Sequence, residues 1–100
     1  CPAVLRARYA FKAGTYAEFR QDWVTATKRY RTAYEALPDV RTGMTTQDII
    51  ETLEVSEVLH VKLCVLLLHS GSPTEAVHQI EKHMRRWSNA ASALGREALP

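Results

Sequence analysis

Apolar side chains recur every three or four residues along most of the chain, which is the period of an α-helix. The recurrence predicts four helices, over about residues 3–19, 23–37, 46–69 and 73–91. The stretch between the second and third contains Asp, Gly and Thr without such a period, which is typical of a loop. Residues from Ser92 onward carry no clear pattern and are either a frayed tail or the start of another helix.

Residues that begin and end helices stand between the periodic runs. Asp22 is placed to cap the second helix, and Pro38 stops it, because proline biases the preceding residue away from helix. Thr46, followed by Asp48, resembles a capping start for the third helix. The turn Ser70-Gly71-Ser72-Pro73 ends the third helix and begins the fourth, with proline in its favoured first turn. We therefore predict one domain over residues 1–100, with a hairpin over 3–37, a loop over 38–46 and a hairpin over 47–91.

The apolar rows predict which side of each helix faces the core. The first helix offers Leu5, Tyr9, Ala13 and Tyr16. The second offers Trp23, Ala26, Tyr30, Ala33, Tyr34 and Leu37. The fourth offers Ala76, Val77, Ile80, Met84 and Trp87. The third is apolar on more than one side, through Ile49, Ile50, Leu53, Val58, Val61, Leu63 and Leu67, and we expect it to be buried on two faces.

Five positions recur fifty residues apart, as expected of an internal repeat. The first copy is Gly14, Ala26, Tyr30, Ala33 and Pro38, and the second is Cys64, Ala76, Ile80, His83 and Ser88. Antiparallel helices approach closely only where small side chains meet, so we expect Gly14 and Ala26 at the contact and Tyr30 beside it. A glycine inside a helix costs about 1 kcal/mol relative to alanine, so Gly14 needs a packing reason. His83 and Ser88 depart from the small residue and the proline of the first copy.

The composition of the chain argues mainly against certain classes of function. The 100 residues are 46% hydrophobic and 24% charged, as in an ordinary globular domain, and the net charge of +2 is too mild for a nucleic-acid-binding surface. The longest apolar run, Leu63 to Leu68, is far shorter than a membrane span. We expect neither nucleic-acid binding, nor direct membrane insertion, nor a small-molecule substrate. The chain opens without Met and closes abruptly, so we expect it to be a piece of a longer protein.

The titratable residues predict no catalytic or metal site. His60 and Cys64 share a helix face, but no CxxC or HExxH pattern accompanies them. We interpret Cys64 as a small core residue and His83 as a packed residue with both nitrogens hydrogen-bonded. The pairs Asp48/Glu51 and Glu54/Glu57 look solvated rather than catalytic. We therefore expect no enzyme activity, no metal and no cofactor. Cys1 and Cys64 could form a disulfide on paper, but their number and placement favour a reducing, intracellular compartment.

Two basic clusters are the main surface features. Lys28, Arg29 and Arg31 lie on the second helix, and Lys82, Arg85 and Arg86 lie on the fourth. They are solvated faces or salt-bridge partners for a neighbouring subunit. Trp23 either packs under the first helix, which we favour, or remains partly exposed as an interface anchor. Trp23, Lys28, Arg29 and Arg31 are thus the candidate interface residues.

Gly14, Ala26, Tyr30, Ala33 and Pro38 resemble the signature of a tetratricopeptide repeat, over residues 7–40. A narrower resemblance is to the foie gras region of subunit 11 of the TRAPP (transport protein particle) complex, and it covers roughly residues 8–87. It is carried in the first half by Ala13, Gly14, Tyr16, Glu18, Phe19, Asp22, Trp23, Ala26, Lys28, Tyr30, Ala33, Tyr34, Glu35 and Leu37. It is carried in the second half by Lys62, Leu63, Cys64, Pro73, Glu75, Ala76, Val77, Gln79, Ile80 and His83.

The resemblance implies a tetratricopeptide-like α-solenoid segment in a vesicle-tethering complex that works between the endoplasmic reticulum and the Golgi. It also implies a cytoplasmic location, peripheral to Golgi or ER–Golgi intermediate membranes. The predicted function is a protein–protein scaffold whose partners are other subunits. The structural positions are Gly14, Ala26, Tyr30, Ala33, Pro38, Cys64, Gly71, Ala76 and Ile80. The alternatives are a peptide-binding tetratricopeptide adaptor, against which the lack of Asn in the first helix of either hairpin argues, and a regulatory domain of a larger enzyme.

Overall fold

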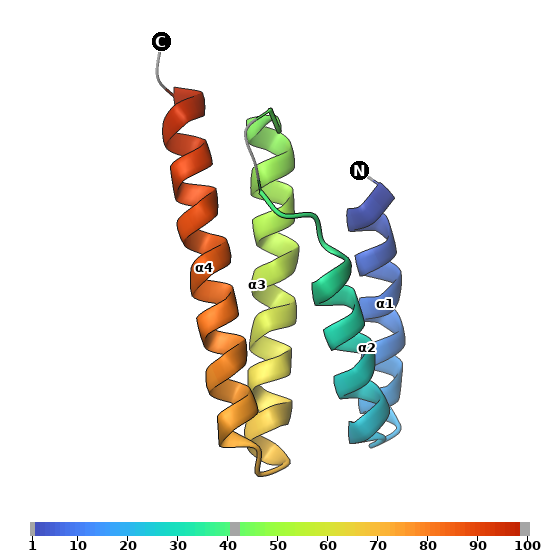
Figure 1. The fold of residues 1–100 in the computed structure, drawn as a ribbon. Coiled ribbons are helices and arrows are strands. Elements are labelled where there is room, and N and C mark those ends of the chain that lie inside the picture. Colours follow the sequence, from blue (N-terminus) through green and yellow to red (C-terminus); the bar gives the residue numbers. More distant parts are fainter. Residues whose placement is uncertain (1, 41–42, 99–100) are drawn as a thin grey trace.

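The computed structural model describes residues 2–40 and 43–98, and this part of the chain contains four helices and no strand. They are α1 (Pro2–Phe19), α2 (Trp23–Ala36), α3 (Thr46–His69) and α4 (Pro73–Ala98). Successive helices run antiparallel and form a shallow, elongated array, in which α3 lies between α4 and the α1–α2 pair (Figure 1). The prediction of an all-α chain is confirmed.

The helix ends follow the local chemistry. The Asp22 carboxylate accepts a hydrogen bond from the Thr25 backbone N–H at 3.2 Å, as predicted for a cap. Leu37, the residue before Pro38, is extended at φ −67° and ψ 139°, so α2 ends at Ala36, one residue earlier than predicted. Thr45, rather than Thr46, caps α3 by accepting from the Asp48 N–H at 3.1 Å.

The fourth helix is longer than the predicted range of 73–91, because it continues to Ala98. Ala90 and Ala93 are buried in its last turns and pack with Val40, Ile49 and Leu53 in a second hydrophobic cluster. The apolar pattern missed this extension because alanine carries little of the periodic signal. Residues 41–42 of the predicted loop lie outside the described residues.

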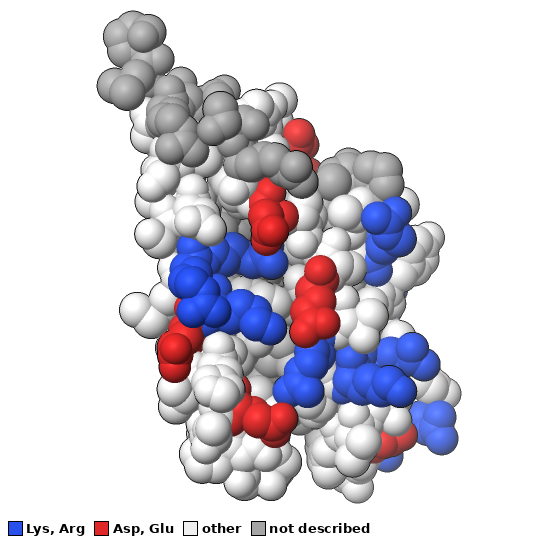
Figure 2. All heavy atoms as spheres, viewed as in Figure 1, with Lys and Arg blue, Asp and Glu red and all other residues white. Residues whose placement is uncertain are grey.

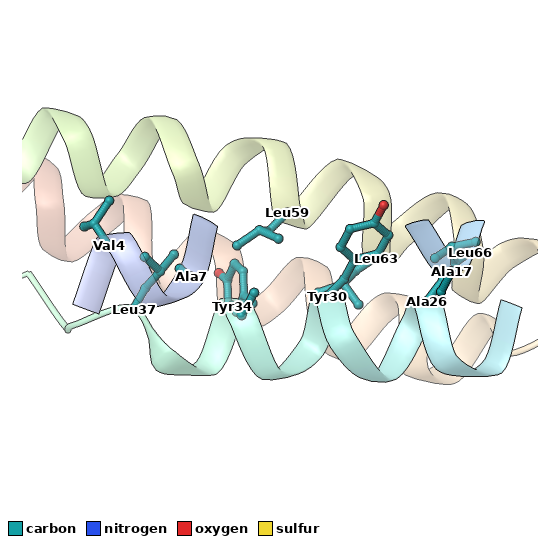
Figure 3. Close-up of a cluster of buried hydrophobic side chains, with 11 residues drawn as sticks. Val4, Ala7, Ala17, Ala26, Tyr30, Tyr34, Leu37, Leu59, Leu63 and Leu66 are labelled. Carbon is teal, nitrogen blue, oxygen red and sulfur yellow. The ribbon is translucent and has the colours of Figure 1, made fainter. Parts of the chain in front are cut away.

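The main core lies where α1, α2 and α3 meet. Tyr30, Ala33, Leu59 and Leu63 are fully buried there, and Figure 3 shows the side chains of the three helices converging in one layer. Phe11 of α1 packs on the Tyr30 ring, with 5.6 Å between ring centroids.

Gly14 leaves room for the Tyr30 ring between α1 and α2. A Cβ atom placed on Gly14 would lie 2.6 Å from Cε1 and 2.7 Å from Cδ1 of Tyr30, well inside van der Waals contact. Because glycine has no side chain, the Tyr30 ring can pack directly against α1 at this position. The hydroxyl of Tyr30 then reaches the Glu18 carboxylate, to which it donates at 2.5 Å.

Three of the predicted inward-facing rows are placed differently by the structure. Leu5, Tyr9 and Tyr16 of α1 are exposed. Val77, Ile80, Met84 and Trp87 of α4 are also exposed, and the buried side of α4 is instead Ala76, Gln79, His83, Ala90 and Ala93. α3 packs against α4 on one side and against α1 and α2 on the other, as expected of a helix buried on two faces. The predicted residues Ile50, Val58 and Val61, together with Val65 and Leu68, are nevertheless exposed.

None of the helices in the described ranges has the length and apolarity needed to cross a bilayer.

Candidate interaction groove

A groove of about 600 Å³ lies between α2 and the turn that joins α3 to α4. Its apolar lining includes Trp23 and Val24 from the first turn of α2 and Leu66 and Leu67 from the last turns of α3. Because Asp22 starts α2 at Trp23, the tryptophan is held at the mouth of the groove, where its ring lies 6.3 Å from the ring of His69. Trp23 is 44% exposed, so it is partly exposed and not packed under α1 as we favoured, and its role as an interface anchor stays a prediction.

Charged side chains from α2 and α4 line and bridge the groove. Arg31 faces Glu75 at 3.9 Å, and Lys82 faces Glu35 at 3.7 Å. Figure 2 shows Lys and Arg in two groups on this face of the molecule, one over α4 and one over α2 and α1, with acidic side chains between them. These ion pairs are exposed and each contributes little to stability, so both partners remain available to another molecule.

The structure brings three of the four candidate interface residues together. Trp23, Lys28 and Arg31 line the groove, whereas Arg29 lies on an exposed part of α2 outside the lining. Residues 28 and 31 are one helical turn apart and share a face, while residue 29 points away from it. The sequence cluster of three basic residues is therefore split between two surfaces.

A second hollow of about 350 Å³ continues along α2 and α4 beyond Glu35, and Lys82, Arg85 and Asn89 line it. Arg86 also lines this hollow. Its guanidinium lies 4.8 Å from the centroid of the Tyr34 ring and donates to the Pro38 carbonyl at 3.1 Å. This arginine thus ties α4 to the end of α2, while Arg85 and Lys82 remain exposed.

A polar network joins α2, α3 and α4 beneath the hollow. The Tyr34 hydroxyl and His83 Nδ1 are 2.9 Å apart, and His83 Nε2 lies 2.7 Å from the Glu57 carboxylate. These distances are satisfied together when Nε2–H donates to Glu57 and Nδ1 accepts from Tyr34. Trp87 donates to the same Glu57 oxygen at 3.1 Å. The expectation that both nitrogens of His83 are hydrogen-bonded is confirmed. Glu57 was expected to be a solvated carboxylate, but it accepts hydrogen bonds from His83 and Trp87.

A second histidine completes the network. The rings of His60 and His83 are stacked, with 3.9 Å between centroids and 11° between planes. The Gln79 amide lies 3.1 Å from His60 Nδ1 and donates to it. Burial, together with the neighbouring His83, lowers the pKa of His60 below its ordinary value, and the hydrogen bond from His83 lowers the pKa of Glu57.

The order hydroxyl, imidazole, carboxylate in Tyr34, His83 and Glu57 resembles a nucleophilic triad. However, Tyr34 is only 1% exposed, and burial raises its pKa, whereas an activated nucleophile needs access to substrate and a lowered pKa. We conclude that the network is structural. Within residues 2–40 and 43–98, no three His, Cys, Asp or Glu side chains come together as ligands for a metal ion.

The other predicted structural positions are distributed as follows. Ala26, Ala33 and Ala76 are buried, and Gly71 adopts φ +80° in the turn before α4, which favours glycine. Cys64 is half-buried beside His60, and burial raises the pKa of its thiol. Ile80 is 42% exposed, unlike its counterpart Tyr30. A disulfide between Cys64 and Cys1, which was possible only on paper, involves a residue outside the described ones.

Sequence reasoning missed Tyr34, Glu57, His60 and Gln79 as members of one network. A signal was present on α4, where Gln79, His83 and Trp87 follow one another at intervals of four residues, the spacing of one helix face. The partners on α2 and α3 are 49 and 26 residues from His83, so their approach depends on how the hairpins dock.

Comparison with known proteins gives two consistent findings. The model of the Foie gras liver health family 1 matches residues 48–99. The chain is also 32% identical over 81 residues to "Trafficking protein particle complex subunit 11" of Homo sapiens and of Bos taurus, and 31% identical to that of Gallus gallus. The aligned part is 81% of this chain but only 7% of each relative. No solved structure matches the chain.

Proposed function

The chain belongs to the Foie gras liver health family 1, and we propose that it is a non-enzymatic scaffold segment of a TRAPP-type vesicle-tethering subunit. The resemblance to the foie gras region of subunit 11 is confirmed by the family match and by the named relatives. The chain spans 7% of those relatives, so the role of the whole subunit, in transport between the endoplasmic reticulum and the Golgi, is part of the proposal. A cytoplasmic position, peripheral to Golgi or ER–Golgi intermediate membranes, follows from the same role.

The observation that carries the proposal is the pair of exposed apolar rows at opposite ends of the helical array. Leu5, Tyr9 and Tyr16 lie on α1, and Val77, Ile80 and Met84 lie on α4. Monomeric proteins rarely expose large apolar side chains in contiguous rows, and such rows mark contacts with other protein surfaces. Repeat units of an α-solenoid carry rows of this kind because each unit packs against its neighbours. We propose that the two hairpins are such a tetratricopeptide-like segment.

The groove between α2 and the turn that joins α3 to α4 supports a scaffold rather than a catalyst. It combines an apolar floor with charged sides, which is the composition of a protein-binding surface. In the proposed role, Trp23 anchors a segment of a partner subunit, while Lys28 and Arg31 pair with its acidic side chains. No residue has a catalytic role in this proposal.

The test uses the full-length subunit that carries this segment, expressed with an affinity tag in cells. We expect the TRAPP subunits to co-purify with it, and the double variant Lys28→Glu/Arg31→Glu to lose at least one of them. Arg29→Glu is the matched control, since it changes charge on the same helix outside the groove. Co-purification that is unaffected by removal of residues 2–98 would contradict a scaffolding role for this segment.

A further inference from the structure

The face of α3 that points away from the core is largely apolar. It carries Ile50, Val58, Val61, Val65 and Leu68, whose spacings of three, four, seven and eight residues place them in one row, which Glu54 interrupts between Ile50 and Val58. The row is flanked on α4 by Trp87, which is also exposed and lines a hollow together with Ile50 and Val58. We call these six residues the α3–α4 apolar face.

Two hollows shape this face. One, of about 510 Å³, lies between α3 and α4 and is lined by Ile50, Val58 and Trp87, with Glu54 and Glu57 at its rim. The other, of about 250 Å³, lies between α1 and α3, and Val58 and Glu54 line it together with Phe11 and Arg8. The two hollows share Val58 and Glu54, so they run on either side of a single ridge. Hollows of this kind accept the side chains of a helix laid along α3.

The charged residues that line the two hollows are mainly acidic, Glu54 and Glu57, with Arg8 of α1 as the exception. α3 carries Asp48, Glu51, Glu54 and Glu57 in its first half, and its single basic residue is Lys62. Lys62 is already paired with Glu18 of α1 at 3.1 Å. Glu57 uses one carboxylate oxygen for His83 and Trp87, and its side chain is still half-exposed. The basic residues of α4, Lys82 and Arg85, line the hollow on the other face, beside α2.

We propose, resting on the scaffold function above, that the α3–α4 apolar face binds a basic amphipathic helix of a partner subunit. The helix inserts apolar side chains beside Val58 and Trp87 and places Lys or Arg opposite Glu54 and Glu57. Stable interfaces are more hydrophobic than transient ones, so a row of five exposed aliphatic side chains favours a resident subunit. A second copy of this chain, docked through the same face, would set the acidic rims against each other, and like charges at an interface disfavour that pairing.

The experiment is photo-crosslinking in the intact complex, with the full-length subunit carrying Val61→p-benzoylphenylalanine. We expect a crosslink to a partner subunit, mapped by mass spectrometry to a helix whose apolar face is flanked by Lys or Arg. The same replacement at Arg29, which lies on α2 outside the groove, is the control and should not reach that helix. A crosslink to the same polypeptide, to a second copy or to a segment without basic residues would overturn the proposal, as would no crosslink at all.

Charge and shape are then tested separately with the partner helix that the crosslink identifies. Glu54→Lys should weaken its binding about two- to fivefold, because a rim charge pair is worth about 0.4–1 kcal/mol. Val58→Asp should weaken it about tenfold or more, as expected for a buried apolar contact. Phe19→Asp, which changes an exposed apolar residue at the far end of α1, is the matched control.

The two proposals fail in different ways. If TRAPP subunits co-purify but Val58→Asp binds the partner helix as well as the unsubstituted protein does, only the assignment of this face is wrong. If no subunit co-purifies, the scaffold function itself is wrong.

Discussion

The second helix of each hairpin carries the same spacing of small and large apolar residues, yet the structure uses the two differently. In α2, Ala26, Tyr30 and Ala33 are all fully buried. In α4, the equivalent alanine, Ala76, is buried, but Ile80 is 42% exposed and His83 takes the inner position of Ala33. The reason is position in the array: within the described residues, α2 packs closely against both α1 and α3, whereas α4 packs closely against α3 and reaches α2 through long side chains such as His83 and Arg86.

The contacts that hold the two hairpins also differ in kind. The first is held by a close approach at Gly14 and by the Tyr30 ring, an arrangement governed by shape. In the second hairpin, α4 is joined to α3 by alanines and by hydrogen bonds that involve His60, Gln79 and His83. These hydrogen bonds depend on which ring nitrogens carry a proton. A repeat in sequence therefore does not guarantee equal burial, since a large residue of the repeat is covered only when another helix follows.

The largest expected difference is between the equivalent positions 30 and 80. Tyr30→Ala removes a fully buried ring and should lower the free energy of unfolding by about 3–5 kcal/mol. Ile80→Ala removes a half-exposed side chain and should cost less than about 1 kcal/mol. Urea unfolding of both variants measures the contrast. Equal losses would mean that Ile80 is covered in the free protein.

The second-largest change in stability is expected when a side chain is added at a glycine. Gly14→Ala places a methyl group against the Tyr30 ring and should destabilise the protein by about 1–3 kcal/mol, the usual cost of overpacking. Gly95→Ala is the matched control on α4, because no atom lies within 4 Å of its added carbon. It should stabilise the helix by up to about 1 kcal/mol. Thermal unfolding distinguishes the two, and a neutral Gly14→Ala would show that α1 can move away without cost.

A smaller effect should appear in the pH dependence of the second hairpin. Since the pKa of His60 is lower in the folded protein than its ordinary 6.5, the unfolded chain binds this proton more readily. The contribution of neutral His60 to stability is thus complete above about pH 6.5 and is lost as the pH falls through the window below it.

Unfolding measured between pH 7.5 and 5.5 should therefore show a slope that His60→Gln reduces. His78→Gln, on an exposed part of α4, is the control and should keep the slope. The lowered pKa of Glu57 acts in the same direction but only below about 4.5, its ordinary value. A slope identical in both variants would show that the stacked histidines do not couple to folding.

The smallest effect is expected for the ion pairs that cross the groove. Glu75→Gln removes the partner of Arg31, and Glu35→Gln removes that of Lys82. Each should change the free energy of unfolding by less than about 0.5 kcal/mol, because exposed pairs are screened by water. A loss above about 1 kcal/mol in either variant would show that α2 and α4 are held together by these charges.

Local chemistry was sufficient to predict much of the fold. The bounds of α1, α2 and α3 differ from the predicted ranges by at most one residue, because caps such as Asp22 and stops such as Pro38 act through their immediate neighbours. The family resemblance was also readable, from residues spread over both hairpins. The end of α4 was not, since its last turns are held by Ala90 and Ala93 against α3 rather than by a strong apolar period.

The sequence by itself determined that the chain is helical, where most helices begin and end, and which residues are apolar on each. Only the tertiary structure decided which apolar rows are buried, that Trp23 and Arg31 share a groove while Arg29 does not, and that Tyr34, Glu57 and His83 meet. The physical reason is that helix formation depends on neighbours within one turn, whereas burial and side-chain networks depend on which helices lie alongside, and α4 has such a neighbour on one side only.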